Sequence, residues 1–254
     1  MNVNADDGFR FMTVLASHRI GPHAQRLRLS GNDLARFDTF ANLHLRLYVP
    51  DEPGQALTRP VLGLDGRPRL SGCAMRYFTI RDIDAAAGWL DIDFVLHEAA
   101  GPACNFACRA KPGEFCGISG PCGLSVKPAR RYLLAGDETA LPAIARIVKS
   151  LPVETEGLIL VDTHARDARV DFDRPPAMAL RWLNGSLPGE EHGFVPAVSR
   201  AIAATVAATD DHFIWIAGEF SNCMALRPCL GKIQKARQLN VPYWRASSSP
   251  EARR

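Results

Sequence analysis

The chain has 254 residues and a mass of 27.8 kDa, too long for one typical domain of about 150 residues and too short for three. Apolar residues make up 47% and charged residues 22%, which excludes disordered, collagen-like and coiled-coil chains. Thirty basic side chains against 27 acidic ones leave a formal net charge of +3, too small to favour a nucleic-acid partner. The sequence therefore predicts two globular domains and no nucleic-acid partner.

The cysteines and the first residues predict the compartment. The seven cysteines are an odd number, and the opening MNVNADDGFRF has acids where a secretory leader needs a basic start and an apolar stretch. We therefore expect free thiols and a cytoplasmic location. The longest apolar runs, at 158–161 and 213–217, are strand-sized, which predicts no stable membrane insertion. The four cysteines within 104–122 match neither a ferredoxin nor a zinc spacing, so no metal site is predicted.

The two halves of the chain have different patterns. From Phe9 to about Lys127, short alternating β-type runs (RFMTVLA, HLRLYVP, RYFTIRDI, WLDIDFVLH, FCGISGP) are separated by Gly, Pro and Asp clusters, which favours a small antiparallel barrel or sandwich. From Arg131 onward, RYLLAG precedes the helical ETALPAIARIVKSL, GLILVDT precedes polar segments, and HFIWIAGEF precedes the helix-like CMALRPCLGKIQKARQL. This alternation predicts a parallel α/β sheet. We place the boundary at KPAR and expect domains at 1–127 and 128–254.

The segment Arg76–Arg81, RYFTIR, is the most informative local motif in the first half. On a strand, Arg76 and Phe78 share one face while Tyr77 and Thr79 share the other. An aromatic ring can cover a flavin, a hydroxyl can bond its polar edge, and a guanidinium can meet a phosphate. An ordinary amphipathic strand with exposed arginines explains the same pattern.

A second motif combines DFVLH at 93–97 with GPAC at 101–104 and the helix-like NFACRAK. A strand followed by a Gly-Pro turn that opens a helix leaves backbone N–H groups free, and such groups suit a pyrophosphate. His97 is a candidate donor to the same anion or to the adenosine portion. A structural hydrogen bond is the alternative role for that histidine.

A third motif, Leu134–Ile144, is a strand, a tight turn and a helix in the second half. It lacks the three-glycine dinucleotide fingerprint. Gly136 nevertheless stands at the turn, and Thr139 stands near the helix start as a candidate cap and phosphate or nicotinamide contact. Ile216–Glu219 ends another strand at what we expect to be the same carboxyl edge of the sheet, where α/β proteins bind ligands.

These motifs, in the order RYFTIR, DFVLH…GPAC, FCGISGPCG, LLAGDETALPAIARI, WIAGE and YWR, resemble the siderophore-interacting protein family of flavin-dependent ferric-siderophore reductases. The resemblance runs from about Phe9 to Arg245, and GDETALPAI is its most specific element. It implies a ferredoxin-reductase-like layout in which an N-terminal antiparallel β-barrel binds FAD and a C-terminal α/β domain binds NAD(P)H.

The resemblance also implies a set of cofactor contacts. Phe78 stands where the family usually has Tyr, Cys104 where it has Ser, and Phe106 where it has Trp. The implied contacts are Arg76, Tyr77, Phe78, Thr79, His97, Gly101, Pro102, Ala103 and Cys104 on the FAD side, and Gly136, Asp137, Glu138, Thr139, Gly218 and Glu219 on the NAD(P)H side.

Ferric siderophores are commonly anionic, so the resemblance implies cations that bind the substrate. Arg46 of HLRLYVP takes the place of a family Lys, and Arg245 of YWR is a second candidate. Cys122 stands where a third cation often follows GP, so Arg130 or Lys127 is a candidate to compensate. Solvated surface charges are the alternative explanation for each of these residues.

The implied activity is NAD(P)H:ferric-siderophore oxidoreduction through FAD, which requires no general acid, base or nucleophile from the protein. Two other functions stay open at this point. One is a related flavin reductase that serves free flavin, a ferredoxin or another acceptor. The other is a siderophore carrier without flavin, because Phe78, Cys104 and Phe106 all depart from the family pattern.

Overall fold

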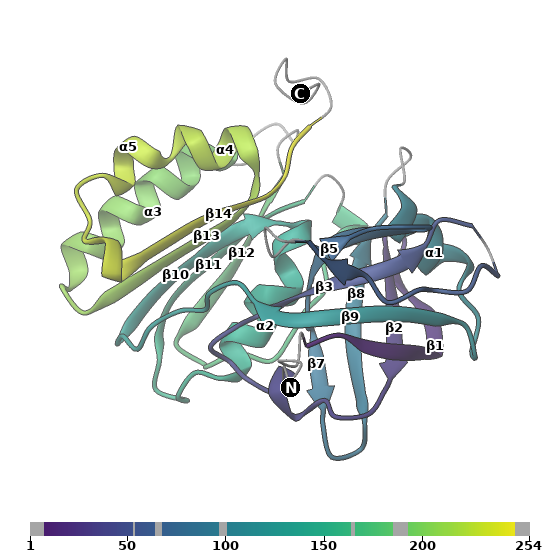
Figure 1. The fold of residues 1–254 in the computed structure, drawn as a ribbon. Helices are drawn as coiled ribbons and strands as arrows, with labels where there is room; N and C mark the ends of the chain where they lie inside the picture. Colours follow the sequence, from purple (N-terminus) through teal and green to yellow (C-terminus); the bar gives the residue numbers. More distant parts are fainter. Residues whose placement is uncertain are drawn as a thin grey trace. The chain divides into compact units, whose positions relative to one another are not determined.

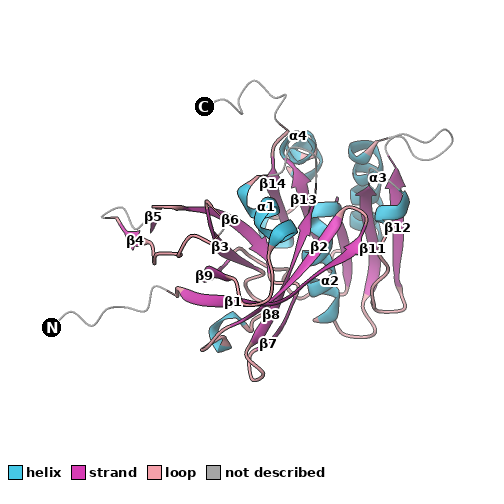
Figure 2. Cartoon of the chain, turned by 90° about the vertical axis from the view of Figure 1, so that its right-hand side faces the viewer, coloured by secondary structure: helices cyan, strands magenta, loops and turns pink. Residues whose placement is uncertain are grey.

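A computed structural model of the chain divides into two compact units, Met1–Ser125 and Val126–Arg254, each with its own main sheet (Figure 1). The predicted boundary lies two residues further along, after residue 127. Strands dominate the first unit, whereas strands and helices alternate in the second (Figure 2). The structure describes residues 8–52, 54–63, 68–96, 101–163, 166–184 and 193–246.

The first unit is an antiparallel seven-stranded sheet in the order β6-β3-β9-β1-β2-β8-β7. Because β6 also contacts β8, the sheet curls back on itself around a core. The antiparallel fold predicted for this half is confirmed. The strands are β1 (Arg10–Gly21), β2 (Ala24–Ser30), β3 (His44–Pro50), β6 (Cys73–Thr79), β7 (Asp82–Asp84), β8 (Trp89–Val95) and β9 (Phe115–Cys122), with a separate ribbon of β4 (Val61–Leu62) and β5 (Pro68–Arg69).

Side-chain alternation builds the core of the first unit. On β2, Leu27 and Leu29 point inward and are fully buried, while Arg26 and Arg28, which alternate with them, point outward. Helix α1 (Pro102–Arg109) packs against β2, β3, β6 and β8. Its Phe106 and Ala107 join the same apolar cluster as the inward residues of the strands. The helix therefore lies on the inner side of the curled sheet.

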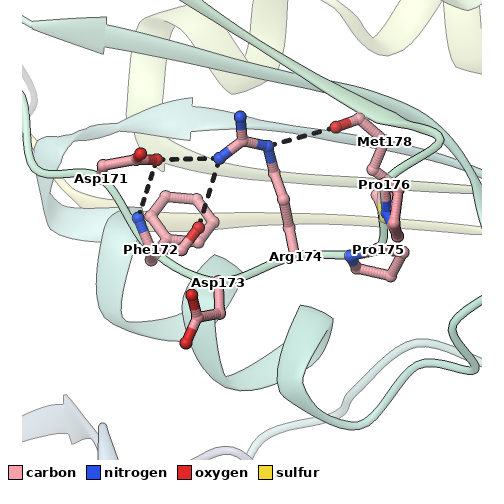
Figure 3. Close-up of a pocket in the computed structure, with 7 residues that line it drawn as sticks. All are labelled: Asp171, Phe172, Asp173, Arg174, Pro175, Pro176 and Met178. Carbon is pink, nitrogen blue, oxygen red and sulfur yellow. Dashed lines mark hydrogen bonds and ion pairs between the residues drawn. The ribbon is translucent and has the colours of Figure 1, made fainter.

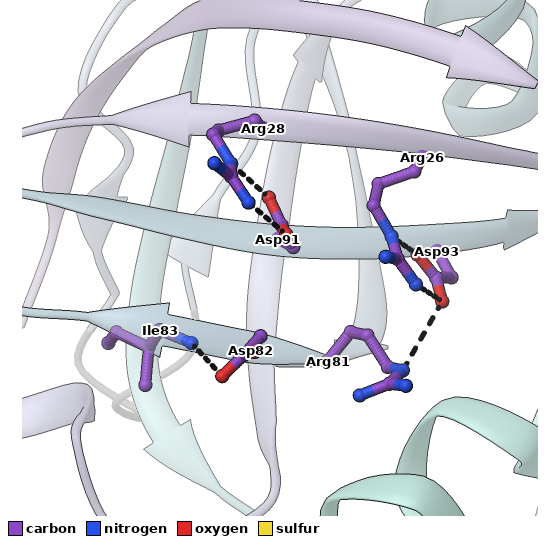
Figure 4. A network of polar contacts seen from close by, with 7 residues as sticks. All are labelled: Arg26, Arg28, Arg81, Asp82, Ile83, Asp91 and Asp93. Carbon is purple, nitrogen blue, oxygen red and sulfur yellow. Dashed lines mark hydrogen bonds and ion pairs between the residues drawn. The ribbon is translucent and has the colours of Figure 1, made fainter. Parts of the chain in front are cut away.

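The outer face of β2 and β8 carries a ladder of ion pairs (Figure 4). Arg26 faces Asp93 and Arg28 faces Asp91 in direct cross-strand register. Each pair is bidentate, with N–O distances of 2.6 and 2.7 Å for Arg26 and 2.8 Å twice for Arg28. Arg81 adds a third guanidinium 3.7 Å from Asp93. The ladder neutralises the acids, including an Asp91 that is only 2% exposed.

The second unit is a five-stranded parallel sheet in the order β12-β11-β10-β13-β14, which confirms the predicted α/β fold. Helix α2 covers one face of this sheet, and α3, α4 and α5 cover the other (Figure 1). The strands are β10 (Arg131–Asp137), β11 (Glu156–Thr163), β12 (Met178–Asn184), β13 (His212–Glu219) and β14 (Gln238–Trp244), and the helices are α2 (Leu141–Lys149), α3 (Phe194–Ala208), α4 (Phe220–Ala225) and α5 (Arg227–Leu230).

Two sequence interpretations of this half are wrong in detail. The segment after GLILVDT is not only polar, since it contains β12 and α3. The helix-like 223–239 segment instead forms two short helices and then the edge strand β14. Pro228 starts the second helix, and the Gln238 side-chain amide donates to the carbonyls of Leu230 and Ile233 at 2.8 and 2.7 Å, which ends helical bonding there. Within the described ranges, no helix is long and apolar enough to span a bilayer.

The ion-pair ladder predicts that buried and exposed carboxylates of the first unit contribute differently to the free energy of unfolding. Asp91→Asn leaves the Arg28 guanidinium without its partner, and we expect a loss of about 2 kcal/mol in the free energy of unfolding. Urea denaturation followed by tryptophan fluorescence measures it, because Arg28 stacks 3.7 Å from the Trp89 ring centroid. Asp33→Asn is the control, since Asp33 is 70% exposed in its pair with Arg10. We expect this change to lower the free energy of unfolding by less than about 1 kcal/mol. Equal losses of stability in the two variants would show that the buried Asp91–Arg28 pair contributes no more than the exposed pair.

Candidate functional site

The edge strand β6 presents its side chains to two different sides. Its register with β3 sets Phe78 opposite Leu45 and Arg76 opposite Leu47, and both leucines are fully buried in the core. Directly paired residues point to the same face of a sheet. Phe78 packs against Phe94, with ring centroids 4.4 Å apart. Arg76 and Phe78 therefore lie on the side of the sheet that α1 covers.

The start of α1 supplies hydrogen-bond donors on that same side. Gly101 is the N-cap, and the first intrahelical bond runs from the Asn105 N–H to the Gly101 carbonyl at 3.0 Å. No described side chain caps the helix, so the N–H groups of Ala103 and Cys104 face outward from its first turn. The exposed guanidinium of Arg76 adds a cation. Backbone donors at a helix start, with an arginine on the same side of the sheet, fit the pyrophosphate of a dinucleotide such as FAD.

The three departures from the family pattern do not occupy these donors. The Cys104 thiol donates to the carbonyl of Val95 at 3.4 Å, and burial raises its pKa, so it stays neutral. Phe106 is only 2% exposed and fills the core. Phe78 keeps an aromatic surface at its position. Pro102, at the first helical position, has no N–H to lose. His97, the remaining candidate of this motif, lies outside the described residues.

Tyr77 and Thr79 lie on the other side of β6. Tyr77 is directly opposite Arg46 of β3, and Thr79 is opposite His44. The Arg46 Nε donates to the Tyr77 hydroxyl at 3.4 Å. Thr79 is buried, whereas Tyr77 is exposed. The structure thus separates the predicted FAD contacts that it describes, and it brings Tyr77 to the predicted substrate cation Arg46.

In the second unit, the Asp137 carboxylate joins the carboxyl ends of three strands. One oxygen accepts from the backbone N–H and the hydroxyl of Thr139, at 2.9 and 2.5 Å. The other accepts from the Glu219 N–H at 2.9 Å and from the Trp244 indole Nε1 at 2.8 Å. Asp137, not Thr139, is therefore the cap of the 3₁₀ turn Glu138–Ala140 that leads into α2. Sequence analysis missed Trp244, since nothing in YWR indicates its partner.

Glycines allow this close packing. A Cβ at Gly136 would collide with Ala140 and with the Ala217 carbonyl of the neighbouring strand. Gly218 has φ +145°, a conformation that disfavours side chains, and a Cβ there would lie 2.5 Å from the Asp137 carboxylate. The two glycines therefore let the strand ends and the 3₁₀ turn pack closely at the carboxyl edge, where α/β proteins bind nucleotides.

Glu219 also has an internal role. Its carboxylate caps α4 by accepting from the N–H groups of Ser221 and Asn222 at 2.5 and 3.2 Å, and it accepts from Ala246 N–H at 3.3 Å. Arg245, next to Ala246, stacks on the ring of Phe220 with 3.6 Å between the guanidinium carbon and the ring centroid. The predicted contacts Asp137 and Glu219 thus organise the edge and hold the residues that follow β14.

The edge carries an excess of acid. Asp162 ends β11 in direct register with Asp137, and Glu138 is nearby. Burial, reinforced by the two neighbouring carboxylates, raises the pKa of Asp162 to about 6. Asp162 therefore binds a proton in mildly acidic solution. The sequence carries a signal for Asp162, an acid near the end of the buried strand GLILVDT.

The predicted cations of this unit lie apart. Arg130 directly precedes β10 and pairs with Glu156 at 3.0 Å, while Arg245 directly follows β14. Because the strands are parallel, the two arginines lie at opposite edges of the sheet, separated by about 20 Å, the length of a seven-residue strand. Lys127 lies on the Arg130 side, where its carbonyl accepts from the Tyr132 hydroxyl at 3.0 Å.

A pocket of about 280 Å³ lies in the loop that precedes β12 (Figure 3). Arg174 spans it, donating to Asp171 at 2.8 Å and to the carbonyls of Phe172 and Met178 at 3.2 Å each. Since the loop enters β12, the pocket is at the amino edge of the sheet, away from Asp137. Its arginine is already bonded within the loop, so the pocket is no candidate for the nucleotide.

The cysteines are free thiols. Cys73, Cys116 and Cys223 are buried, and Cys108 is exposed. Burial raises the pKa of Cys223 to about 12, which keeps this thiol protonated and unreactive at neutral pH.

Comparisons with known proteins decide the family. Residues 13–125 match the siderophore-interacting FAD-binding domain, and residues 129–247 match the siderophore-interacting protein domain. The chain belongs to the siderophore-interacting protein family. The two matches follow the two structural units, so the resemblance inferred from the motifs is confirmed, and the FAD-binding assignment falls on the unit that holds Arg76 and α1.

Relatives cover nearly the whole chain. The siderophore-interacting protein SipS from Aeromonas hydrophila is 32% identical, with a TM-score of 0.74 over 98% of this chain and 96% of its own. The ferric vibriobactin reductase ViuB of Vibrio cholerae is 26% identical over 96% of this chain and 92% of its own. The NADPH-dependent ferric-chelate reductase of Escherichia coli is 29% identical over 85% of this chain and 84% of its own.

The four bonds to Asp137 predict a structural role that is separate from cofactor binding. In Asp137→Asn the amide must turn its NH₂ toward one pair of these donors, so we expect the second unit to lose about 2 kcal/mol of unfolding free energy. Thermal and urea denaturation of the protein measure this loss. Asp210→Asn, a change at an exposed carboxylate of the same unit, is the control and should be neutral. An unchanged stability would show that the network is not formed.

The raised pKa of Asp162 predicts that replacing this acid stabilises the protein, in contrast to Asp137→Asn. The folded state binds this proton more tightly than the unfolded state, so the contribution of Asp162 to stability falls as pH rises from about 4 to about 6. Above pH 6 the charged carboxylate carries the full penalty. Asp162→Asn should therefore raise the free energy of unfolding by about 2 kcal/mol at pH 8 and have little effect at pH 4. A loss of stability at pH 8, measured by urea denaturation, would contradict this.

Proposed function

We propose that this protein is an FAD-dependent reductase that transfers electrons from NAD(P)H to the iron of a ferric siderophore in the cytoplasm. The observation that carries the proposal is the donor set of the first unit, where the start of α1, which no described side chain caps, and the exposed Arg76 lie on one side of β6. Membership of the siderophore-interacting protein family supplies the substrate class. The names of two relatives, a ferric vibriobactin reductase and a ferric-chelate reductase, agree with the reaction.

The FAD-side residues have distinct roles in this proposal. The N–H groups of Ala103 and Cys104, with the guanidinium of Arg76, would hold the pyrophosphate. Phe78 would supply an aromatic surface for the flavin, and its contact with Phe94 fixes the ring. FAD, when bound, supplies the chemistry that couples a two-electron donor to one-electron acceptors. The protein holds and orients the cofactor and contributes no acid, base or nucleophile.

We place NAD(P)H at the carboxyl edge of the parallel sheet, at Gly136–Thr139 and Gly218–Glu219. The glycines let the backbone of the strand ends pack closely at this edge, because a Cβ at either position would collide with neighbouring atoms. Asp137 and Glu219 contribute by shaping this edge, because their carboxylates are bonded within the protein. Glu138 and Thr139 stay candidate contacts on the 3₁₀ turn.

Arg46 and Arg245 are the proposed cations for the anionic substrate. Arg46 has a raised pKa because it bonds to the Tyr77 hydroxyl, so it stays charged. Arg245 is held against the ring of Phe220. Arg130 is left out of the proposal because its guanidinium pairs with Glu156 at the amino edge. One NAD(P)H supplies two electrons, so two ferric ions become ferrous, and the oxygen donors of a siderophore hold Fe(II) less tightly than Fe(III).

The reaction is tested on the purified protein supplied with FAD. We expect a yellow flavoprotein whose absorbance near 450 nm is bleached by NADH or NADPH under anaerobic conditions and restored by a ferric siderophore. A ferrous chelator measures the Fe(II) released. A protein that binds the siderophore but never FAD would be a carrier, and equal rates with unrelated acceptors would indicate a general flavin reductase. Either result would overturn the proposal.

The proposed FAD site predicts how the positive charge of Arg76 affects the affinity for FAD. Arg76→Ala removes charge-assisted hydrogen bonds to the pyrophosphate, and we expect the Kd for FAD to rise by about tenfold or more. Equilibrium titration of the apoprotein with FAD, followed by flavin fluorescence, gives the value. Arg19→Ala is the control, because Arg19 is also exposed in the first unit but lies in the β1–β2 hairpin. An unchanged Kd for Arg76→Ala would remove this arginine from the site.

A further inference from the structure

Tyr77 stands out among the residues of the RYFT strand. Its neighbours Arg76 and Phe78 point to the α1 side, but Tyr77 points the other way and is 60% exposed. Among the described residues, β6 is an end strand of its sheet, and it contacts β8 where the sheet curls back on itself. A large aromatic side chain is thus open to a ligand on the side away from the proposed FAD pyrophosphate site.

Arg46 shares that face with Tyr77. Its Nε donates to the Tyr77 hydroxyl at 3.4 Å, and its guanidinium carbon lies 5.6 Å from the centre of the ring. No described carboxylate pairs with Arg46. Arg26 and Arg28 of β2, in contrast, form ion pairs with acids of β8. The cation of Arg46 is therefore balanced by an aromatic ring and not by an acid, which leaves its charge available to an anion.

The groups that the structure describes around Tyr77 and Arg46 are neutral or basic. Arg46 faces Ser119 of β9, whose hydroxyl bonds to Tyr48 at 3.0 Å, and the Cys122 thiol is close enough for Arg46 to lower its pKa, although burial raises it overall. Further along the same face, the guanidinium of Arg59 lies 5.5 Å from the ring centroid of Phe9. The face combines aromatic surface with positive charge.

We infer that Tyr77 is a substrate-contact residue, paired with Arg46, that favours ferric chelates with aromatic, anionic ligands. This inference rests on the proposed function. Catecholate chelates of Fe(III) present aryl rings at their surface and carry net negative charge, so a ring can stack on Tyr77 while Arg46 meets the phenolate oxygens. Simple hydroxamate chelates of Fe(III) are aliphatic and neutral, and they gain little from either group. The structure thus moves Tyr77 from the FAD contacts to the substrate side.

The test measures binding without electron transfer. The probes are the Ga(III) complexes of 2,3-dihydroxybenzoate and of acetohydroxamate, which copy the ferric complexes but are not reduced. The FAD-loaded protein and its variants are titrated with each probe. We expect Tyr77→Leu to raise the Kd for the catecholate by about fivefold and to change the Kd for the hydroxamate less than twofold. Tyr77→Phe keeps the ring, so it should keep most of the affinity.

Phe115→Leu is the matched control. Phe115 is 59% exposed and stands at the other end of β9 from Cys122, so its loss should leave both Kd values unchanged. A loss of FAD from Tyr77→Leu would return Tyr77 to the cofactor site and overturn the inference. So would equal effects on the two probes, or wild-type protein that does not bind the catecholate.

The same variants separate this inference from the proposed function. If the wild-type protein binds the Ga(III) catecholate through Tyr77 but reduces no ferric chelate with NADH or NADPH, the reductase proposal fails and the substrate contact stands. If reduction proceeds, the KM for ferric catecholate should rise about fivefold in Tyr77→Leu with kcat unchanged, because the ring contributes to binding. A fall in kcat with an unchanged KM would contradict the role.

Discussion

The alternation of side chains along one edge strand determines how the first unit divides its chemistry. β6 pairs in register with β3, so consecutive residues must point to opposite faces. Arg76 and Phe78 lie with α1, and Tyr77 lies with Arg46. A shift of one residue in this register would exchange the two sets. The buried leucines of β3 prevent such a shift, because it would turn the apolar face of that strand to water.

Arginines in this protein have two kinds of environment, and the difference separates structure from function. Those on β2 form bidentate pairs with acids directly across from them, so their charge is used within the fold. Arg46 and Arg76 instead bond to neutral groups. A near-neutral net charge therefore coexists with local positive charge. It is these two arginines, and not the total, that the proposed function assigns to an anionic substrate and cofactor.

The carboxyl edge of the second unit is organised by one carboxylate. Asp137 accepts hydrogen bonds from two loops and from Trp244, and this requires Gly218 beside it. An acid in a strand-turn-helix motif is readily taken for a ligand contact. Here its oxygens are already satisfied within the protein, so in the proposed function it would act on a nucleotide through the backbone that it positions.

The sequence by itself determined the two fold types, most of the strands and the family, because alternation and motif order are local properties of the chain. It also gave the α1 start and Arg76, since a Gly-Pro helix opening and an arginine are visible in the letters. It could not show that Arg130 and Arg245 lie at opposite sheet edges, nor that Asp137 bonds Trp244, 107 residues away. Only the tertiary structure decides such pairings, because strand order and register bring distant residues together, and neither is written in any local pattern.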